Sequence, residues 1–122
     1  MTARQGLGAL GERLAAQHLE RAGLVIIARN VRIERNEVDL IARDGETLVF
    51  VEVRTRRGAA GAGAESVTAA KLARVAACAR AWCEREGVDP ELTRLDVVAV
   101  ELDARGRALG CRHFRGVEVP GL

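Results

Sequence analysis

The sequence predicts an α/β fold in which a helix, three strands, a second helix and two closing strands follow one another along the chain. Two long segments that end at glycines have the spacing of helices. Five shorter segments, the first of them rich in valine and isoleucine, are typical of strands. The chain has 122 residues and a mass of 13.1 kDa, which suits one hydrophobic core, and we expect residues 1–122 to form a single domain.

The first half of the chain is predicted to contain one helix and three strands. The helix covers residues 6–22, because Gly23 is typical of a helix C-terminus. The predicted strands cover residues 24–33, 37–43 and 46–54. The segment LVFVEV in the third strand is apolar on both faces apart from Glu52, and this predicts a central strand covered on both sides.

The second half of the chain is predicted to begin with a mobile loop over residues 58–64, because the segment GAAGAGA cannot pack a core. A long helix follows over residues 67–86 and ends at Gly87. The two closing strands are predicted over residues 94–102 and 109–117, with a turn at residues 104–106 between them.

The dipeptide Asp44-Gly45 stands between the second and third strands and is a strong hairpin signal. With these two as the turn residues, the expected cross-strand pairs are Asp39 with Phe50 and Glu37 with Glu52. Because side chains alternate along a strand and opposite residues share a face, one face of the sheet carries Glu37, Asp39, Glu52 and Arg54. Asp39 and Glu52 become diagonal neighbours, about 7–8 Å apart, and can grip one ion between them.

Two interpretations of this acidic face remain open from the residues alone. A buried carboxylate needs a partner, and two glutamates that face each other repel unless a cation lies between them. One interpretation is an ion-pair network in which the acids are neutralised by Arg35, Arg54 and Arg56. The other is a hard divalent cation held by carboxylate oxygens.

Glu12 and Lys71 are charged residues at unusual places on the two predicted helices. The helical neighbours of Glu12 are mostly glycine and alanine, so the helix can approach a sheet closely while an acid points into the contact. Lys71 is the only lysine and lies on the apolar stripe of the second helix. The alternatives are an ordinary surface charge for Glu12 and, for Lys71, an ammonium that extends into solvent.

The overall composition excludes several classes of protein. A net charge of +2 gives no global basic field that would indicate nucleic acid, and 48% hydrophobic with 30% charged residues exclude wholesale disorder. The apolar runs are too short for a membrane span, and Glu12 and Arg13 interrupt any signal-peptide core. We therefore expect a soluble cytoplasmic protein in which Cys78, Cys83 and Cys111 are free thiols.

Four separated blocks of the sequence resemble the YraN-like family of uncharacterised bacterial proteins. The blocks are GLGALGERLAAQHL near the N-terminus, NEVDLIARDGETLVFVEVRTR over residues 36–56, the later Lys71, and RLDVVAV. The resemblance extends from about Gly6 to Phe114. That family is similar to archaeal Holliday-junction resolvases of the PD-(D/E)XK nuclease superfamily, which implies a restriction-endonuclease-like fold with a mixed central β-sheet flanked by helices.

The resemblance also implies roles for individual residues. Asp39 matches the metal-binding aspartate of the superfamily, and Glu52 matches the acid of its E-x-K element. Glu12 matches the glutamate of the first helix, and Glu37 matches the acid of the GEIDLIA-like block of the family. These matches imply a Mg²⁺ or Mn²⁺ site whose ligands are Asp39, Glu52, Glu12 and Glu37.

Two residues depart from the family pattern. Asn36 stands where the block usually opens with glycine. Arg54 stands where the superfamily carries a lysine that orients the attacking water and helps to deprotonate it. Arginine stays protonated and cannot act as a base, although it can stabilise negative charge on a phosphate. Lys71 is the residue that could supply the missing ammonium.

Three functions are compatible with these residues. The first is a metal-dependent nuclease that acts on DNA rather than RNA, on branched or processed structures. Its catalytic residues are Asp39, Glu52, Arg54 and Lys71, and its contacts to the phosphate backbone are Arg54, Arg56 and Arg57. The second is a catalytically inactive nucleic-acid-binding module, which Arg54 and the modest net charge favour. The third is a protein-interaction domain with its first helix at a homodimer interface.

Overall fold

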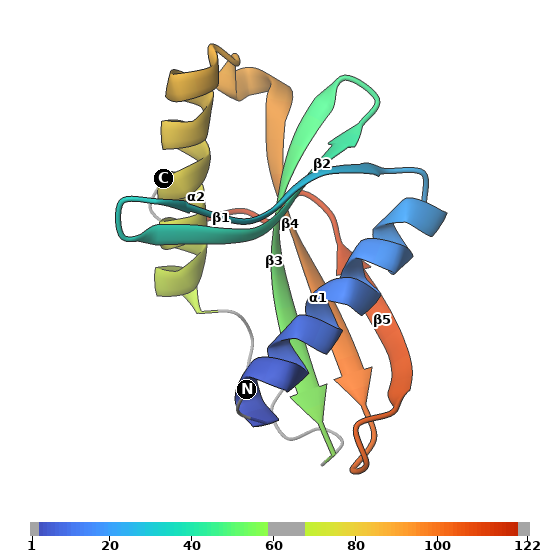
Figure 1. Ribbon diagram of the computed structural model, residues 1–122. Coiled ribbons are helices and arrows are strands. Elements are labelled where there is room, and N and C mark those ends of the chain that lie inside the picture. The colour runs from blue at the N-terminus through green and yellow to red at the C-terminus, as the bar shows by residue number, and fades with distance from the viewer. Residues whose placement is uncertain (1–2, 59–67, 120–122) are drawn as a thin grey trace.

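The structure, a computed structural model, describes residues 3–58 and 68–119. Within these residues, helices and strands follow one another in the predicted order (Figure 1). Their bounds are α1 Ala3–Arg21, β1 Val25–Ile33, β2 Asn36–Asp44, β3 Thr47–Arg57, α2 Ala69–Glu86, the short 3-10 helix η2 Pro90–Leu92, β4 Thr93–Leu102 and β5 Ala108–Phe114. Apart from Gly58, the predicted loop over residues 58–64 lies outside the described residues.

The five strands form one open sheet in the order β1-β2-β3-β4-β5. Neighbouring strands are antiparallel except β3 and β4, which run parallel. A parallel pair needs a crossover connection, and the segment that contains α2 supplies it. The predicted fold class, α/β with a mixed central sheet flanked by helices, is confirmed, and the arrangement is compatible with a restriction-endonuclease-like fold.

The two helices cover opposite faces of the sheet (Figure 1). Helix α1 packs against all five strands, whereas α2 packs mainly on β1, β2 and β3. The apolar cluster beneath α1 includes Ala16, Leu19, Val51 and Val98. The cluster beneath α2 includes Val38, Phe50, Val75 and Cys78. Strand β3 contributes to both clusters, so the segment LVFVEV forms the central strand that the sequence predicted.

Both helices end where glycine allows a left-handed backbone. Gly23 follows α1 with φ 97°, and Gly87 caps α2 with φ 69°, so both predicted helix ends are confirmed within two residues. At the start of α2, the Thr68 side chain accepts a hydrogen bond of 3.2 Å from the backbone N–H of Lys71. This cap fixes Lys71 in the first turn of the helix.

The turn between β2 and β3 lies one residue later than predicted, and the cross-strand register is therefore shifted by two residues. Its turn residues are Gly45 and Glu46, and Asp44 pairs with Thr47 at the ends of the strands. Gly45 has φ 61°, and a two-residue hairpin turn that requires glycine at its first central position suits this conformation. Asp44 therefore belongs to the strand rather than to the turn.

The displaced register changes which acids face each other. Phe50 and Glu37 take other partners, so the predicted pairs Asp39–Phe50 and Glu37–Glu52 are wrong. The observed partners are Ile41 for Phe50 and Arg32 for Glu37. A shift of two residues leaves every side chain on its predicted face, because the side-chain period of a strand is two. Continued past its last regular pair, the register sets Asp39 directly opposite Glu52.

Strand β5 is shorter than predicted and ends at Phe114 rather than at residue 117. Gly116 has φ 63°, which turns the chain. Its backbone N–H donates a hydrogen bond of 2.9 Å to the carboxylate of Asp96 instead of continuing the β4–β5 ladder. The regular strand therefore ends here, although the Val117 N–H still donates a hydrogen bond of 2.7 Å to the carbonyl oxygen of Leu95 in β4.

Helix α1 crosses β3 in close contact at Gly11. A Cβ atom at this position would overlap the side chain of Thr55, whose own Cβ atom would be only 2.9 Å away. Glycine thus lets the helix backbone approach the sheet one residue before Glu12. This approach agrees with the prediction made from the small residues around Glu12.

The sequence also predicted that the chain has no membrane-spanning segment and that its cysteines are free thiols. In the part of the chain that the structure describes, neither helix has the length and apolar character that crossing a membrane requires. Cys78, Cys83 and Cys111 are free thiols, as predicted.

Candidate functional site

Two carboxyl groups meet where β2 separates from β3. The backbone ladder between these strands ends with Leu40 opposite Val51. Beyond that pair, the carboxylate of Asp39 accepts a hydrogen bond of 2.8 Å from the Val53 N–H, so a side chain replaces the backbone acceptor. Strand β2 leaves β3 at this point and runs with β1 toward α2 (Figure 1). The divergence fixes Asp39 beside Glu52.

Asp39 and Glu52 are joined by a hydrogen bond between their carboxyl groups. Burial raises the pKa of Glu52 to about 8, and the charge of Asp39 and the hydrogen bond with it act in the same direction. Burial also raises the pKa of Asp39, although the Val53 N–H and the hydrogen bond with Glu52 oppose the shift. We call these two residues the acid pair. Because the pKa of Glu52 is raised to about 8, the acid pair retains a proton at neutral pH.

Glu12 of α1 is the third acid near this site, and Asn30 of β1 orients it through a side-chain hydrogen bond. Burial, followed by the charge of Asp39, raises the pKa of Glu12. Asn30 stands opposite Asp39 in the β1–β2 register and has φ 50°, a left-handed conformation that asparagine tolerates better than most residues. Asn30 was not predicted from the sequence, where its signal was an asparagine inside a strand rich in valine and isoleucine.

Glu37 and Lys71 lie at the margin of the acid pair. The Glu37 carboxylate forms an exposed ion pair with Arg32 at 3.0 Å, and its charge raises the pKa of Asp39. Lys71 is exposed at the start of α2, and its positive charge acts to lower the pKa values of both Asp39 and Glu52. The structure therefore sets Lys71 within electrostatic reach of the acid pair, while Glu37 faces solvent.

Within residues 3–58 and 68–119, no group of three acidic, histidine or cysteine side chains is arranged to hold a metal ion. The acid pair by itself offers two carboxyl groups. Their oxygen atoms are ligands that a hard divalent cation prefers, and a cation can replace the proton that they share. Two carboxyl groups suit Mg²⁺ or Mn²⁺ when water or substrate oxygens supply the remaining ligands.

Three arginines continue β3 beyond the acid pair. Alternation along the strand sets Arg54 and Arg56 on the same side as Glu52. The charge of Arg54 acts to lower the pKa of Glu52. Arg57 points elsewhere, and its Nε donates a hydrogen bond of 2.9 Å to the carbonyl oxygen of Ala104 in the β4–β5 turn. Two of the three predicted phosphate contacts thus share the face of the acid pair.

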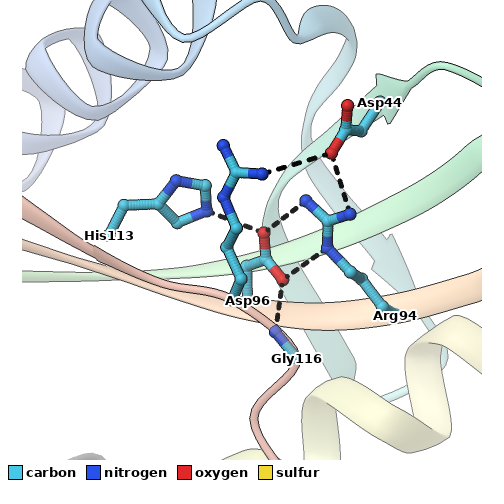
Figure 2. Close-up of polar contacts among 6 residues, drawn as sticks. Asp44, Arg94, Asp96, His113 and Gly116 are labelled. Carbon is cyan, nitrogen blue, oxygen red and sulfur yellow. Dashed lines mark hydrogen bonds and ion pairs between the residues drawn. The ribbon is translucent and has the colours of Figure 1, made fainter.

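A second group of charged side chains, which we call the Asp96 cluster, was not predicted from the sequence (Figure 2). Asp96 is fully buried. Its donors are Arg94 Nε at 3.0 Å and Nη2 at 3.2 Å, His113 Nε2 at 2.7 Å and the Gly116 N–H at 2.9 Å. Asp44 forms ion pairs with Arg94 at 2.8 Å and with Arg115 at 3.7 Å. The cluster therefore joins the β2–β3 hairpin to β4, β5 and the segment after β5.

The Asp96 cluster stabilises the fold on the other face of the sheet. Burial acts to raise the pKa of Asp96, but hydrogen bonds from Arg94, the Gly116 N–H and His113 hold it below its ordinary value of 3.8. Glu52 pairs with the residue that follows Asp96, so alternation sets the two side chains on opposite faces. The sequence signal for Asp96 was an acid within the apolar strand RLDVVAV, the same kind of signal that identified Glu52.

The pKa of Glu52 predicts how stability depends on pH. The folded, cation-free protein retains a proton that the unfolded chain releases above its ordinary pKa of 4.5. Stability should therefore decrease as pH rises from 4.5 to about 8, by at most about 1.4 kcal/mol per pH unit for this group. Urea unfolding in EDTA across this range should show the decrease.

Glu52→Gln should remove most of this pH dependence, because glutamine does not titrate. Glu20→Gln is the matched control, since Glu20 is an exposed acid near the C-terminus of α1, and it should keep the wild-type slope. The interpretation of the acid pair fails if Glu52→Gln and wild type lose stability equally between pH 5 and pH 8.

A family model described as uncharacterised protein family UPF0102 matches residues 11–100. A UPF0102 protein of Beutenbergia cavernae is 48% identical over 118 residues, which cover 96% of this chain and 99% of that protein. A UPF0102 protein of Symbiobacterium thermophilum is 51% identical over 107 residues, which cover 87% and 90% of the two chains. One of Kineococcus radiotolerans is 44% identical over 117 residues, with 94% and 95% covered. The segment that the family model matches contains Glu12, Asp39, Glu52 and Lys71.

Proposed function

The chain belongs to the uncharacterised protein family UPF0102, and we propose that it is a metal-dependent nuclease that hydrolyses phosphodiester bonds of DNA. The observation that carries the proposal is the acid pair, in which Asp39 and Glu52 are partly buried and joined by a hydrogen bond where β2 leaves β3. Burying two acids side by side is costly for the fold, and acids with strongly raised pKa values concentrate at functional sites.

Asp39 and Glu52 are the residues that would hold Mg²⁺ or Mn²⁺. Glu12 would complete the site directly or through water, and Glu37 would contribute negative charge from the margin. When bound, the cation supplies Lewis-acid polarisation of the scissile phosphate and of an attacking water. The protein holds the ligands in place through its own groups, because the Val53 N–H orients Asp39 and the Asn30 side chain orients Glu12.

Arg54 and Lys71 would bring positive charge to the phosphate. Arg54 stands two residues after Glu52, on the same face of β3, and it stays protonated. It would therefore stabilise negative charge on the phosphate rather than accept a proton. Lys71 carries the ammonium that acts on both members of the acid pair, so it would take the part of the lysine that the superfamily places at position 54.

A catalytically inactive nucleic-acid-binding module is the second candidate function. Arg54 favours it, because a guanidinium in place of the lysine keeps affinity for phosphate and lacks an acid–base group. The same face and the same arginines would serve both functions. The two candidates differ in turnover alone, so an assay of cleavage separates them.

Incubation with fluorescently labelled DNA tests the proposal directly. Four-way junctions, flaps and linear duplexes cover the branched, processed and unbranched structures. We expect strand cleavage of at least one of these in Mg²⁺ or Mn²⁺ and none in EDTA. DNA that is bound but left intact in both metals would overturn the nuclease and favour the binding module.

Substitutions of Lys71 and Arg54, the two cationic side chains near the acid pair, should change turnover in opposite directions. Lys71→Met should keep the fold and the affinity for Mn²⁺ and lose about 10²-fold or more of its turnover, since a positioned acid–base group contributes on this scale. Arg54→Lys should raise turnover and reduce the dependence on Lys71. Single-turnover cleavage rates of the two variants and of the double variant measure both effects.

Arg74→Met is the matched control for Lys71→Met, because it removes an exposed cation from the same helix, one turn further on. Its rate should equal that of the wild type. An unchanged rate in Lys71→Met, together with no gain in Arg54→Lys, would remove both cations from the mechanism.

A further inference from the structure

Three rows of residues run across β3, β4 and β5 on the face that α2 covers only in part. Helix α2 packs mainly on β1, β2 and β3, and Figure 1 shows β5 at the far edge of the sheet. The rows, read from the strand register, are Glu52–Val97–Phe114, Arg54–Ala99–Arg112 and Arg56–Glu101–Gly110. Residues side by side in neighbouring strands share a face, so the first row begins at the acid pair and ends at Phe114.

Phe114 is an exposed aromatic side chain at the end of this row. It is 44% exposed, whereas Phe50, the other phenylalanine of the chain, is buried in the core. The guanidinium carbon of Arg112 lies 5.5 Å from the centroid of the Phe114 ring. An aromatic ring with a guanidinium beside it offers a surface for a base and a charge for the adjoining phosphate.

The charge on this face suits a polyanion. Arg54, Arg56 and Arg112 stand on it, together with two acids, Glu101 and the Glu52 of the acid pair. Phe114 is two strands away from Glu52, about 10 Å at the usual spacing of strands. A base on the Phe114 ring would therefore belong to a nucleotide close to the phosphate at the acid pair.

We propose that the face formed by these three rows binds single-stranded DNA, with Phe114 as the platform on which an unpaired base stacks. The proposal rests on the proposed function and deepens it, because it assigns the substrate as DNA with unpaired bases beside the scissile phosphate. A duplex keeps its bases stacked inside and cannot use the ring, whereas every unpaired base has a face that stacks on an aromatic side chain.

The alternative is that this face forms a homodimer interface with a second copy of the chain. An interface between two identical copies of this face would bring its arginines together, and like charges in contact weaken association. The charge therefore favours DNA over a second copy.

Fluorescence anisotropy with a labelled oligothymidylate of about 12 nucleotides tests the proposal. EDTA in the buffer separates binding from cleavage. Phe114→Ala should weaken binding at least about fivefold, and Phe114→Trp should keep or strengthen it, because stacking on an aromatic ring has this scale. Leu109→Ala is the matched control, since it removes an exposed apolar side chain of β5 outside the three rows, and it should bind like the wild type.

Salt dependence separates stacking from phosphate contact. Arg112→Ala should reduce the slope of log affinity against log salt by about 0.7, the value for one phosphate contact on a single strand. Phe114→Ala should leave that slope unchanged, and it should leave the affinity for a duplex of the same length unchanged. These two results together identify the ring as a stacking surface.

Equal affinity of wild type and Phe114→Ala for the oligothymidylate would overturn the proposal. The cleavage assay would still test the proposed nuclease activity independently. Weaker binding by Phe114→Ala supports the platform even if no DNA is cleaved, in which case the nuclease fails and the platform belongs to a binding module. Conversion of a dimer to a monomer by Phe114→Ala, with unchanged affinity, would assign the face to a second copy. If the protein binds an oligouridylate of the same length more tightly than the oligothymidylate, the proposal that the bound strand is DNA is overturned.

Discussion

Replacing Asp39 or Glu52 by alanine is expected to abolish divalent-metal binding and DNA cleavage. The two carboxyl groups form a unit, and one alone cannot hold the cation that the proposed reaction needs. Turnover should fall to about one-thousandth of the wild-type rate or less. Calorimetric titration with Mn²⁺ and single-turnover cleavage measure the two losses separately.

The same substitutions should stabilise the cation-free protein at about pH 8, because they relieve the burial and the repulsion of two acids. A gain in stability with a loss of function is the pattern typical of a functional site. Glu20→Ala is the control, since it removes an exposed acid near the C-terminus of α1, and it should bind Mn²⁺ with little change. Unchanged Mn²⁺ affinity in both Asp39→Ala and Glu52→Ala would refute the metal site.

Asp96→Ala should cause the largest loss of stability among single substitutions of charged residues in the described sheet. It removes the acceptor of the part-buried Arg94 guanidinium and of the nearly buried His113 ring, and breaking a buried pair of this kind costs about 3–5 kcal/mol. That is a large part of the stability of an ordinary domain, about 5–15 kcal/mol. Urea unfolding at pH 7 measures the loss.

Two further variants sharpen this prediction. Glu101→Ala removes an exposed acid from the same strand and should cost no more than about 1 kcal/mol. Asp96→Asn keeps the shape but turns an NH₂ group toward a donor. Because the folded pKa of Asp96 is lowered, its contribution is present above pH 3.8 and is lost as pH falls through the folded pKa, so acid should weaken wild type more than Asp96→Asn. A cost below about 1 kcal/mol for Asp96→Ala would show that Asp96 is not a main support of the fold.

The β2–β3 hairpin shows how much of the site the sequence could predict. Alternation of side chains set Asp39 and Glu52 on one face, and this held although the turn was misplaced, because a shift of two residues preserves the face. The turn itself was wrong because Asp44-Gly45 and Gly45-Glu46 both contain the glycine. The sequence does not reveal whether glycine takes the first or the second central position, and that choice sets the register.

The roles of Asn30 and Asp96 could not be predicted from the sequence, because these roles depend on contacts with elements that are distant in the chain. Asn30 acts through a left-handed backbone conformation and a hydrogen bond to Glu12 on another element. The partners of Asp96 lie on β4, on β5 and after β5, and they are linked in turn to the β2–β3 hairpin. A pattern in one strand shows an acid among apolar residues, and it leaves open whether that acid meets another acid or a set of donors.

The parallel pairing of β3 with β4 has a consequence for the order in which the molecule assembles. Strands β1, β2 and β3 form hairpins between near neighbours, whereas β4 reaches β3 only after the chain has passed through α2. Contacts that are distant in the chain close later than hairpins, because the loop entropy is larger. Asp39 and Glu52 therefore come together while still in water and ionised at neutral pH. When α2 and β4 then cover Glu52, burial raises its pKa and the acid pair takes up a proton, so late assembly of this chain is linked to proton uptake at its candidate site.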